Sequence, residues 1–340
     1  GRASRRMAES TGVDNASTLH SLLGLYGEEG GFRKGEEDML DAGLIIVDES
    51  SMMDMWLARK FFSRIGPDTK VLLVGDADQL QSVGAGDVFR ELINCGLIPV
   101  TVLNEIFRQK KDSLIAYNAQ KINNNDTSFF YGNDFTVCKC ANQEEAAEHI
   151  RNIYLAQVKQ YGVDRVQILS PFRSTGAASA DQLNEAIREL VNPQTEEADL
   201  KVGSLYFRVG DKIMQNKNST KASNGDIGFI RSFRHDERDG MRISIQFSPT
   251  RVVEYSMEEM GHVELAYVVI FPLLRSHARM LTRSLIYTAI TRAKAKVILV
   301  GQIGMLYMAV HKDDTGKRNT QLGRRIALYV NTFKVQKRSA

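Results

Sequence analysis

Cysteines and long apolar runs are the features that this sequence has least of. Its three cysteines, Cys95, Cys138 and Cys140, include one C-x-C pair and no flanking histidine cluster, which predicts neither a disulfide framework nor a zinc site. No stretch approaches the roughly 18 to 20 consecutive apolar residues of a membrane span, and the opening segment GRASRRMAES lacks the apolar core of a secretory signal. We therefore expect reduced, structural thiols in a folded cytoplasmic protein with no membrane partner.

A large excess of charge of one sign is also missing. The net charge of +3 is too small to indicate a partner, because a protein that binds a polyanion needs only a local groove of Lys and Arg. Basic residues do gather at both ends of the chain, and we interpret the C-terminal group as a solvated helix face followed by a tail. That group is Lys312, Lys317, Arg318, Arg324, Arg325, Lys334, Lys337 and Arg338. The length of 340 residues, 43% of them hydrophobic, allows two domains of ordinary size.

Two apolar runs each end in carboxylates. Leu44–Val47 is followed by Asp48 and Glu49, and Val71–Val74 leads to Asp76. Aliphatic runs without alternation are typical of parallel strands that helices cover on both faces, and ligands of such sheets bind at the carboxyl ends of the strands. We therefore expect the three acids to lie at a binding edge.

Two interpretations of these acids remain open at this point. In a nucleoside triphosphatase, the first acid of such a pair holds Mg²⁺, while the second orients the attacking water or accepts its proton. Alternatively, the strands simply run into acidic loop residues, as they do in many α/β proteins. The rest of the chain has to decide between them.

The first third of the chain alternates strand and helix patterns. Residues 1–107 contain the two apolar runs and an apolar helix over Val88–Ile93, which indicates a doubly wound parallel sheet. Gly24–Gly35 is rich in glycine and charge, so we expect a surface excursion with a short hairpin. Residues 110–164 read as a helical connection that ends in the amphipathic segment Glu144–Tyr161.

A second α/β region follows, and another fold interrupts it. We expect a buried strand at Arg165–Ser170 and a helix over Ala180–Leu190. From Leu200 the segments become short and strand-like, with turn signals at Asn224-Gly225 and Asp239-Gly240, which predicts a small antiparallel barrel. The α/β pattern then resumes with strands at Val268–Leu274 and Lys296–Gly301.

An ordered series of motifs resembles the RecD-like DNA helicases of superfamily 1B, over nearly the whole chain. The motifs are GRASRRMAESTG, TLHSLL, LIIVDESSM, VGDADQLQSVGAGDVFREL, LNEIFRQ, ILSPFR, FRVGDKIMQNKN, NGDIG and MLTRSLIYTAITRAK. The resemblance implies an α/β fold with two RecA-like parallel-sheet domains of the P-loop NTPase type, the first of them truncated, and an SH3-like barrel inserted in the second. The implied boundaries are 1–109 for the first domain, 110–199 with 263–340 for the second, and 200–262 for the barrel.

The resemblance also assigns roles around ATP and Mg²⁺. It implies that Asp48 holds Mg²⁺, that Glu49 activates water, and that Gln79 senses the γ-phosphate through an amide that can donate and accept hydrogen bonds. Arg108 and Arg292 would contact the γ-phosphate, where a guanidinium keeps its charge and makes forked contacts with oxygens. For Arg292 the alternative is a helix residue paired with a surface acid.

For DNA, the resemblance points to Arg2, Thr18, His20 and, more weakly, Asn224. Such residues contact phosphates and sugars and so position a single strand without reading its sequence. A lone histidine is as often a structural hydrogen-bonding residue, which is the alternative for His20. The implied partners are single-stranded DNA and junctions of duplex with single strand.

The sequence departs from the family pattern at three places. It contains no G-x-x-x-x-G-K-[ST] loop, whose amides and lysine bind phosphates. At Tyr267–Val268 it lacks a T-x-H-K-x-Q-G-x-E segment, so we expect a fragment or a hidden chain break there. Gln81 replaces the usual proline, which we expect to loosen its loop. A complete polypeptide with this sequence should not hydrolyse ATP appreciably.

The function expected from these observations is an ATP-dependent 5′-to-3′ DNA helicase that moves on single-stranded DNA and couples ATP hydrolysis to strand separation. One alternative is the helicase part of a conjugative relaxase or of a multi-subunit exodeoxyribonuclease, with nuclease or repair-protein subunits as partners. An alternative of another class is a DNA-binding module that does not hydrolyse ATP, which the absent phosphate loop favours.

Overall fold

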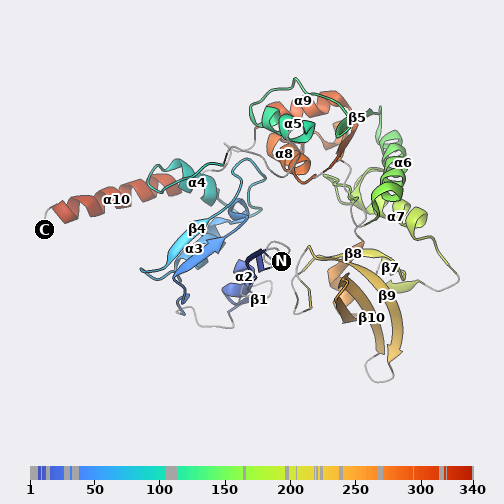
Figure 1. The fold of residues 1–340 in the computed structure, drawn as a ribbon, viewed down its shortest axis with the longest axis horizontal. Helices are drawn as coiled ribbons and strands as arrows, with labels where there is room; N and C mark the ends of the chain where they lie inside the picture. The colour runs from blue at the N-terminus through green and yellow to red at the C-terminus, as the bar shows by residue number, and fades with distance from the viewer. Residues whose placement is uncertain are drawn as a thin grey trace. The chain divides into compact units, whose positions relative to one another are not determined.

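The computed structural model describes residues 7–8, 10–12, 16–26, 31–32, 38–103, 113–163, 166–195, 199–203, 205–217, 219, 221–222, 225–236, 240–265, 271–293, 295–313, 318 and 320–338 (Figure 1). The chain divides into two compact units. The β3–β4 unit comprises Ala3–Phe130, Thr282–Lys294 and Ala309–Ala340, and the barrel unit comprises Gly1–Arg2, Tyr131–Leu281 and Ala295–Met308. The domain boundaries expected from the sequence stay a prediction.

The β3–β4 unit is named after its pair of parallel strands. β3 (Leu44–Val47) pairs with β4 (Lys70–Leu73) in parallel register, as the two apolar runs predicted. β1 (Leu25–Tyr26) and β2 (Gly31–Phe32) form the expected antiparallel hairpin. The helices are α2 (Leu19–Leu22), α3 (Met55–Phe62), α4 (Val88–Asn94), α5 (Leu114–Asn123), α8 (Arg283–Thr291) and α10 (Leu322–Arg338), and the short 3-10 helix η1 spans Ser50–Met52.

The two faces of the β3–β4 pair differ in burial. Ile45, Val47, Val71 and Leu73 face a core that includes Leu23, Leu57, Phe61 and Val88. On the alternate positions, Leu44, Ile46, Leu72 and Val74 are 53%, 47%, 49% and 42% exposed. The prediction that helices cover both faces is therefore wrong for these strands as the structure describes them, because the elements around the pair pack on one side only.

The second unit contains the expected antiparallel barrel. Its sheet has the order β11-β10-β9-β8-β12, and its core includes Phe207, Ile230, Ile243, Ile245 and Tyr255. The strands are β8 (Lys212–Gln215), β9 (Ile227–Asp236), β10 (Gly240–Ser248), β11 (Arg251–Ser256) and β12 (Val263–Leu265), and a separate pair comprises β6 (Leu200–Val202) and β7 (Leu205–Phe207). The short strand-like segments therefore predicted the barrel correctly.

A second parallel sheet lies in the same unit, in the order β13-β14-β5. Its strands are β13 (Phe271–Leu273), β14 (Val297–Gly301) and β5 (Phe135–Lys139), and the helices near it in sequence are α6 (Gln143–Tyr161), α7 (Ala180–Val191) and α9 (Ile303–His311). Nearly every residue of β13 and β14 is buried, so these two strands are covered on both faces, as expected for parallel strands. The predicted α/β class, with parallel sheets and an inserted barrel, is confirmed.

Two local predictions in this unit were wrong. β5 lies in a stretch expected to be helical. The segment 166–170, expected to be a strand, buries Val166 and Ile168 but forms no regular strand. The apolar pattern of this segment correctly predicts which side chains are buried. A strand also needs a neighbouring strand whose backbone N–H and C=O groups are free to pair, and the local sequence does not reveal such a neighbour.

Charged residues fasten the barrel to α7. Arg188 on α7 approaches both carboxylate oxygens of Asp211, at 3.0 and 2.9 Å, and both side chains are buried. Arg208 binds Asp199 at 2.8 Å and Glu189 at 2.7 Å. Forked contacts of this kind fix orientation as well as distance, so the barrel and α7 should move together.

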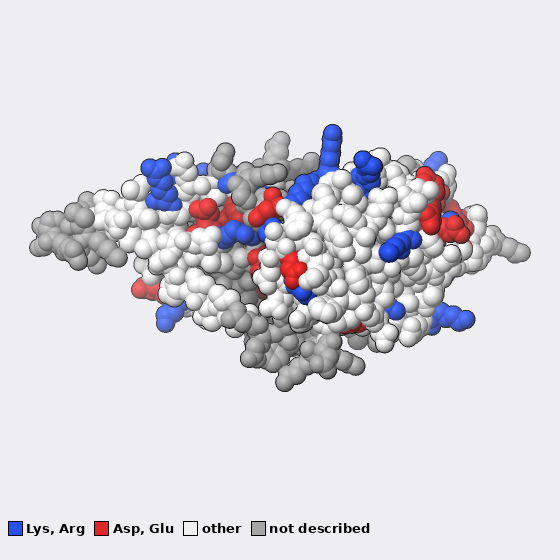
Figure 2. All heavy atoms as spheres, turned by 90° about the horizontal axis from the view of Figure 1, so that it is seen from above, with Lys and Arg blue, Asp and Glu red and all other residues white. Residues whose placement is uncertain are grey.

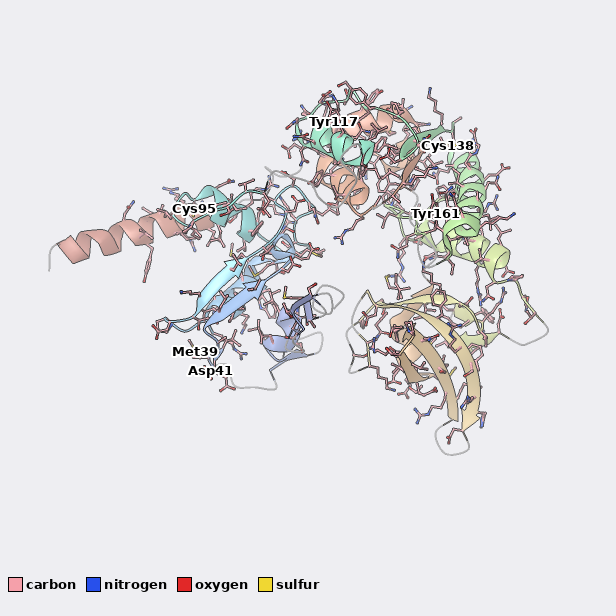
Figure 3. The ribbon with its side chains drawn as sticks, viewed as in Figure 1. Met39, Asp41, Cys95, Tyr117, Cys138 and Tyr161 are labelled. Carbon is pink, nitrogen blue, oxygen red and sulfur yellow. The ribbon has the colours of Figure 1, made fainter. Side chains whose placement is uncertain are left out.

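The cysteines are free thiols, as expected. Figure 3 labels Cys95 after α4 and Cys138 on β5. Burial raises the pKa of Cys138, and it raises the pKa of Cys140 to about 11. Both groups are therefore protonated and unreactive near neutral pH. None of the helices in the described part of the chain is long and apolar enough to cross a membrane.

Candidate active site

The end of β3 presents Asp48 and Glu49. Val74 N donates to Val47 O at 2.8 Å and Ser50 N donates to Val74 O at 2.9 Å, so the ends of the two strands are held together by backbone hydrogen bonds. Glu49 N also donates to Asp48 Oδ1 at 2.8 Å. The Asp48 side chain is exposed and that of Glu49 is half-buried. The chain therefore delivers both carboxylates to the binding edge of the sheet.

Glu49 has a left-handed backbone, with φ 53° and ψ 38°. A residue with a Cβ pays about 1–2 kcal/mol for this conformation. The turn is kept because Ser50 Oγ donates to Val47 O at 2.8 Å and η1 begins directly after Glu49. Backbone strain of this kind concentrates at functional sites, so its presence at an acidic strand end favours a chemical role for Glu49.

The loop after β4 is organised by Asp76. A Cβ on the preceding Gly75 would lie 3.1 Å from Ser50 N, which is closer than most Cβ contacts, so a larger residue would require the two loops to move slightly apart. Asp76 Oδ2 accepts hydrogen bonds from Gln79 Nε2 at 3.2 Å and from Tyr287 Oη at 3.0 Å. The Asp76 carboxylate thus holds the amide of Gln79, and the Tyr287 hydroxyl holds the Asp76 carboxylate.

Helix α8 meets the same loop at the next residue. Leu80 N donates to Thr288 Oγ1 at 2.8 Å, so consecutive residues of α8 bind Asp76 and Leu80. Burial, together with the charge of Asp76, raises the pKa of Tyr287, which keeps its hydroxyl protonated as a donor. Sequence reasoning missed the roles of Tyr287 and Thr288, although both lie inside the IYTAITRAK motif.

Arg292 ends α8 as its C-cap residue. It lies four positions after Thr288, a spacing that puts the two residues on neighbouring positions of one helix face. Its side chain is exposed and makes no ion pair with another residue that the structure describes. The alternative of a surface ion pair therefore has no support within the described ranges.

Residues 82–86 form a tight loop that leads into α4. Arg318 Nη1 donates to Gly84 O at 2.5 Å and to Gly86 O at 2.7 Å, and Nη2 donates to Ser82 O. The interpretation of Arg318 as part of a solvated basic face is therefore wrong, because backbone carbonyls surround its guanidinium. No signal in the local sequence could have found this contact, which joins residues more than 230 positions apart.

Gln81 makes a side-chain hydrogen bond next to this loop. Its Nε2 donates to Asp87 Oδ2 at 2.9 Å, a hydrogen bond that a proline could not make. The expectation that Gln81 loosens the loop stays a prediction, and this hydrogen bond is a contact that opposes it.

The candidate DNA contacts are only partly described. Thr18 is the N-cap of α2, where its Oγ1 accepts from Ser21 N at 3.2 Å, and His20 is exposed on the same helix. Arg2, Arg108 and Asn224 lie outside the described residues, as do Tyr267 and Val268. Figure 2 shows Lys and Arg side chains interspersed with Asp and Glu side chains on the face that it presents.

The carboxylates at the end of β3 suit a Mg²⁺ ion that takes most of its ligands from a nucleotide and from water. No group of three or more His, Cys, Asp or Glu residues that could hold a metal occurs in the part of the chain that the structure describes. Mg²⁺ in nucleotide sites needs only one or two carboxylates, because phosphate oxygens and water supply its other ligands. Asp48, exposed at the strand end, meets that requirement.

Three family models match consecutive parts of the chain. They are the AAA domain over residues 1–143, the ATP-dependent RecD-like DNA helicase SH3 domain over 183–247, and the UvrD-like helicase C-terminal domain over 264–300. Together with the parallel sheets, they define the fold class as that of RecA-like helicases with an SH3 domain. The resemblance to RecD-like helicases is thereby confirmed.

Two curated relatives agree with this assignment. The ATP-dependent RecD2 DNA helicase of Deinococcus radiodurans is 30% identical over 96% of this chain and 45% of its own length. The RecBCD enzyme subunit RecD of Mycolicibacterium smegmatis is 26% identical over 88% of this chain and 57% of its own. The chain thus spans about half the length of these curated relatives. The Pif1 helicase of Candida albicans aligns with a TM-score of 0.44 and 16% identity, over 94% of this chain and 86% of that one.

Proposed function

We propose that the chain is part of the motor of an ATP-dependent DNA helicase that moves 5′ to 3′ on single-stranded DNA. The observation that carries the proposal is the pair Asp48 and Glu49 in a strained turn at the carboxyl end of β3, beside the Asp76–Gln79 contact at the end of β4. The name of one relative, ATP-dependent RecD2 DNA helicase, supports this proposal. The direction of movement rests on the resemblance alone.

In this proposal the residues divide the chemistry between them. Asp48 would hold Mg²⁺, and the bound ion would supply positive charge to the phosphates of ATP. Glu49 orients a water molecule and accepts its proton, a role that suits a half-buried carboxylate held by a rigid turn. Arg292, together with Arg108, contacts the γ-phosphate and stabilises the negative charge that develops on its oxygens.

DNA binding is proposed for residues on and around α2. The exposed side chain of His20 and the hydroxyl of Thr18 are available to phosphates and sugars. We propose that Arg2 and Asn224 contact the same DNA strand. Contacts of this type hold a strand in place without sequence preference. Junctions of duplex with single strand are the proposed substrates for strand separation.

Two alternatives are tested beside this proposal. The name RecBCD enzyme subunit RecD among the relatives favours a motor that works with nuclease or repair-protein subunits. The other alternative is a DNA-binding module that does not hydrolyse ATP. Mass spectrometry of subunits that copurify with the protein tests the first alternative, and translocation tests the second.

Streptavidin displacement tests the proposed movement. The full-length protein is mixed with ATP and single-stranded oligonucleotides that carry biotin–streptavidin at one end. Movement 5′ to 3′ removes streptavidin from the 3′ end and leaves the 5′ block in place. Displacement from the 5′ end would contradict the direction. Tight binding of the strand without displacement at either end would favour the DNA-binding module.

A further inference from the structure

Asp76 accepts two side-chain donors, and one of them is Gln79. The 3.2 Å hydrogen bond from Gln79 Nε2 occupies the amino side of that amide, so the carbonyl oxygen points away from Asp76. The amide of a glutamine can adopt two orientations of nearly the same shape, which exchange its oxygen and its nitrogen. A glutamine that responds to a ligand must be held in one of them. Asp76 selects that orientation only if the Asp76 carboxylate is itself held in place.

Tyr287 fixes Asp76. Its hydroxyl donates to the same Oδ2 atom at 3.0 Å, while Asp78 N donates to Oδ1 at 3.0 Å. Asp76 is therefore held at both oxygens. Asn123 Nδ2 on α5 donates to Asp78 Oδ2 at 2.8 Å, and this bond secures the other side of the loop.

Thr288 fixes the backbone of the loop. Its Oγ1 accepts from Leu80 N at 2.8 Å, one residue after Gln79. Helix α8 carries Tyr287 and Thr288 within its nine residues and ends at its C-cap residue, Arg292. The loop after β4 therefore contacts the same helix that presents Arg292.

We propose that Tyr287 and Thr288 are positioning residues that hold Gln79 in its working orientation and couple the loop after β4 to Arg292. This inference deepens the proposed function and rests on it. Neither residue contacts the reacting atoms in the proposal. Tyr287 acts through Asp76 and Gln79, and Thr288 acts through the backbone at Leu80.

The first experiment tests the contacts without requiring activity. Hydrogen exchange is measured by mass spectrometry on a peptide that covers residues 76–84 in the 340-residue chain. Thr288→Val removes the acceptor for Leu80 N, so exchange in this peptide should become faster, while Thr288→Ser should retain slow exchange. Tyr287→Phe should also increase exchange. Unchanged exchange in both Thr288→Val and Tyr287→Phe would overturn the inference.

The second experiment tests the coupling in the full-length protein by DNA-stimulated ATP hydrolysis. Loss of one hydrogen bond to a charged group predicts that Tyr287→Phe lowers kcat about tenfold, with KM for ATP and Kd for oligo-dT nearly unchanged. Tyr117→Phe on α5 is the matched control, since Tyr117 is 54% exposed and labelled in Figure 3. That variant should behave like the unmodified protein.

A double variant separates positioning from general destabilisation. If Tyr287 acts through Gln79, then Tyr287→Phe in a Gln79→Ala background should cause no further loss of kcat. Fully additive losses would overturn the proposed route through Gln79. If the unmodified protein shows no DNA-stimulated hydrolysis, the proposed function fails, and the exchange experiment still decides whether the contacts exist.

Discussion

Glu49 combines a side chain suited to proton transfer with a backbone conformation that few residues adopt easily. The strand followed by Asp48 and Glu49 could be predicted from the sequence, because an apolar run that ends in acids is visible locally. Its left-handed φ of 53° could not, since the neighbouring strand and the Ser50 contacts impose it. The second donor to Asp76 was equally hidden, because Tyr287 is 211 positions from Asp76.

The strain at Glu49 predicts an unusual order of stability. Glu49→Gly should be more stable than Glu49→Ala by about 1 kcal/mol, because glycine adopts the left-handed region without a Cβ clash. Urea denaturation of the 340-residue chain measures this difference. Glu144 in the first turn of α6 provides the control, where alanine should be the more stable of the two substitutions. Equal stability of Glu49→Gly and Glu49→Ala would contradict the strain.

At the scale of elements, most helices and the barrel strands could be predicted because their apolar spacing is local. α7 was expected over Ala180–Leu190 and spans Ala180–Val191. β5 was missed because Phe135–Lys139 mixes apolar and polar residues and becomes a strand by pairing with β14, far along the chain. The loop of residues 82–86 depends in the same way on Arg318, which the sequence placed on a solvated surface.

Arg318 should control the order of this loop. Arg318→Ala removes the guanidinium donor from the carbonyls of Ser82, Gly84 and Gly86, and only the last two keep the Ser82 hydroxyl as a donor. The expected cost is about 1–3 kcal/mol in the free energy of unfolding. Hydrogen exchange of a peptide that covers residues 80–88 should become faster. Arg324→Ala on α10 is the control, because Arg324 is exposed. The assignment fails if both variants exchange alike.

The turn before α8 should make stability depend on pH. His277 is fully buried against Phe172, and burial lowers its pKa below the ordinary 6.5. The unfolded chain therefore binds a proton at a higher pH than the folded chain does. The free energy of unfolding should be constant above the unfolded pKa and should decrease as pH falls toward the folded pKa, by up to about 1.4 kcal/mol per pH unit.

A comparison of variants isolates this contribution. Denaturation curves between neutral pH and about pH 5, a range that spans the ordinary pKa of histidine, are measured for the unmodified chain and for His277→Gln. The variant should lose part of the pH dependence because it has no imidazole to protonate. The same slope in both proteins would show that His277 does not titrate in this window.

At the scale of the whole molecule, the sequence indicated an α/β protein with an inserted barrel and a RecD-like order of motifs. The prediction that helices cover both faces of β3 and β4 was wrong, although β13 and β14 are covered on both faces. An aliphatic run alone does not show how many neighbours a strand has, because the same residues suit one-sided and two-sided packing.

The one-sided core predicts opposite effects for neighbouring residues of β4. Leu72→Lys should change the free energy of unfolding of the 340-residue chain by no more than about 0.5 kcal/mol, because Leu72 is 49% exposed. Leu73→Lys should cost more than about 2 kcal/mol, because it puts a charge against the core around Phe61. Similar losses for both variants in urea denaturation would show that the outer face is covered in solution.

DNA-stimulated ATP hydrolysis by the full-length protein tests the central claim most directly. We expect hydrolysis that rises when oligo-dT is added, and a loss of about 100-fold or more in kcat for Glu49→Gln, with ATP and DNA binding retained. Glu144→Gln, on the exposed surface of α6, should hydrolyse ATP normally. Normal turnover in Glu49→Gln would contradict the role of Glu49, and no hydrolysis by the unmodified protein would contradict the motor itself.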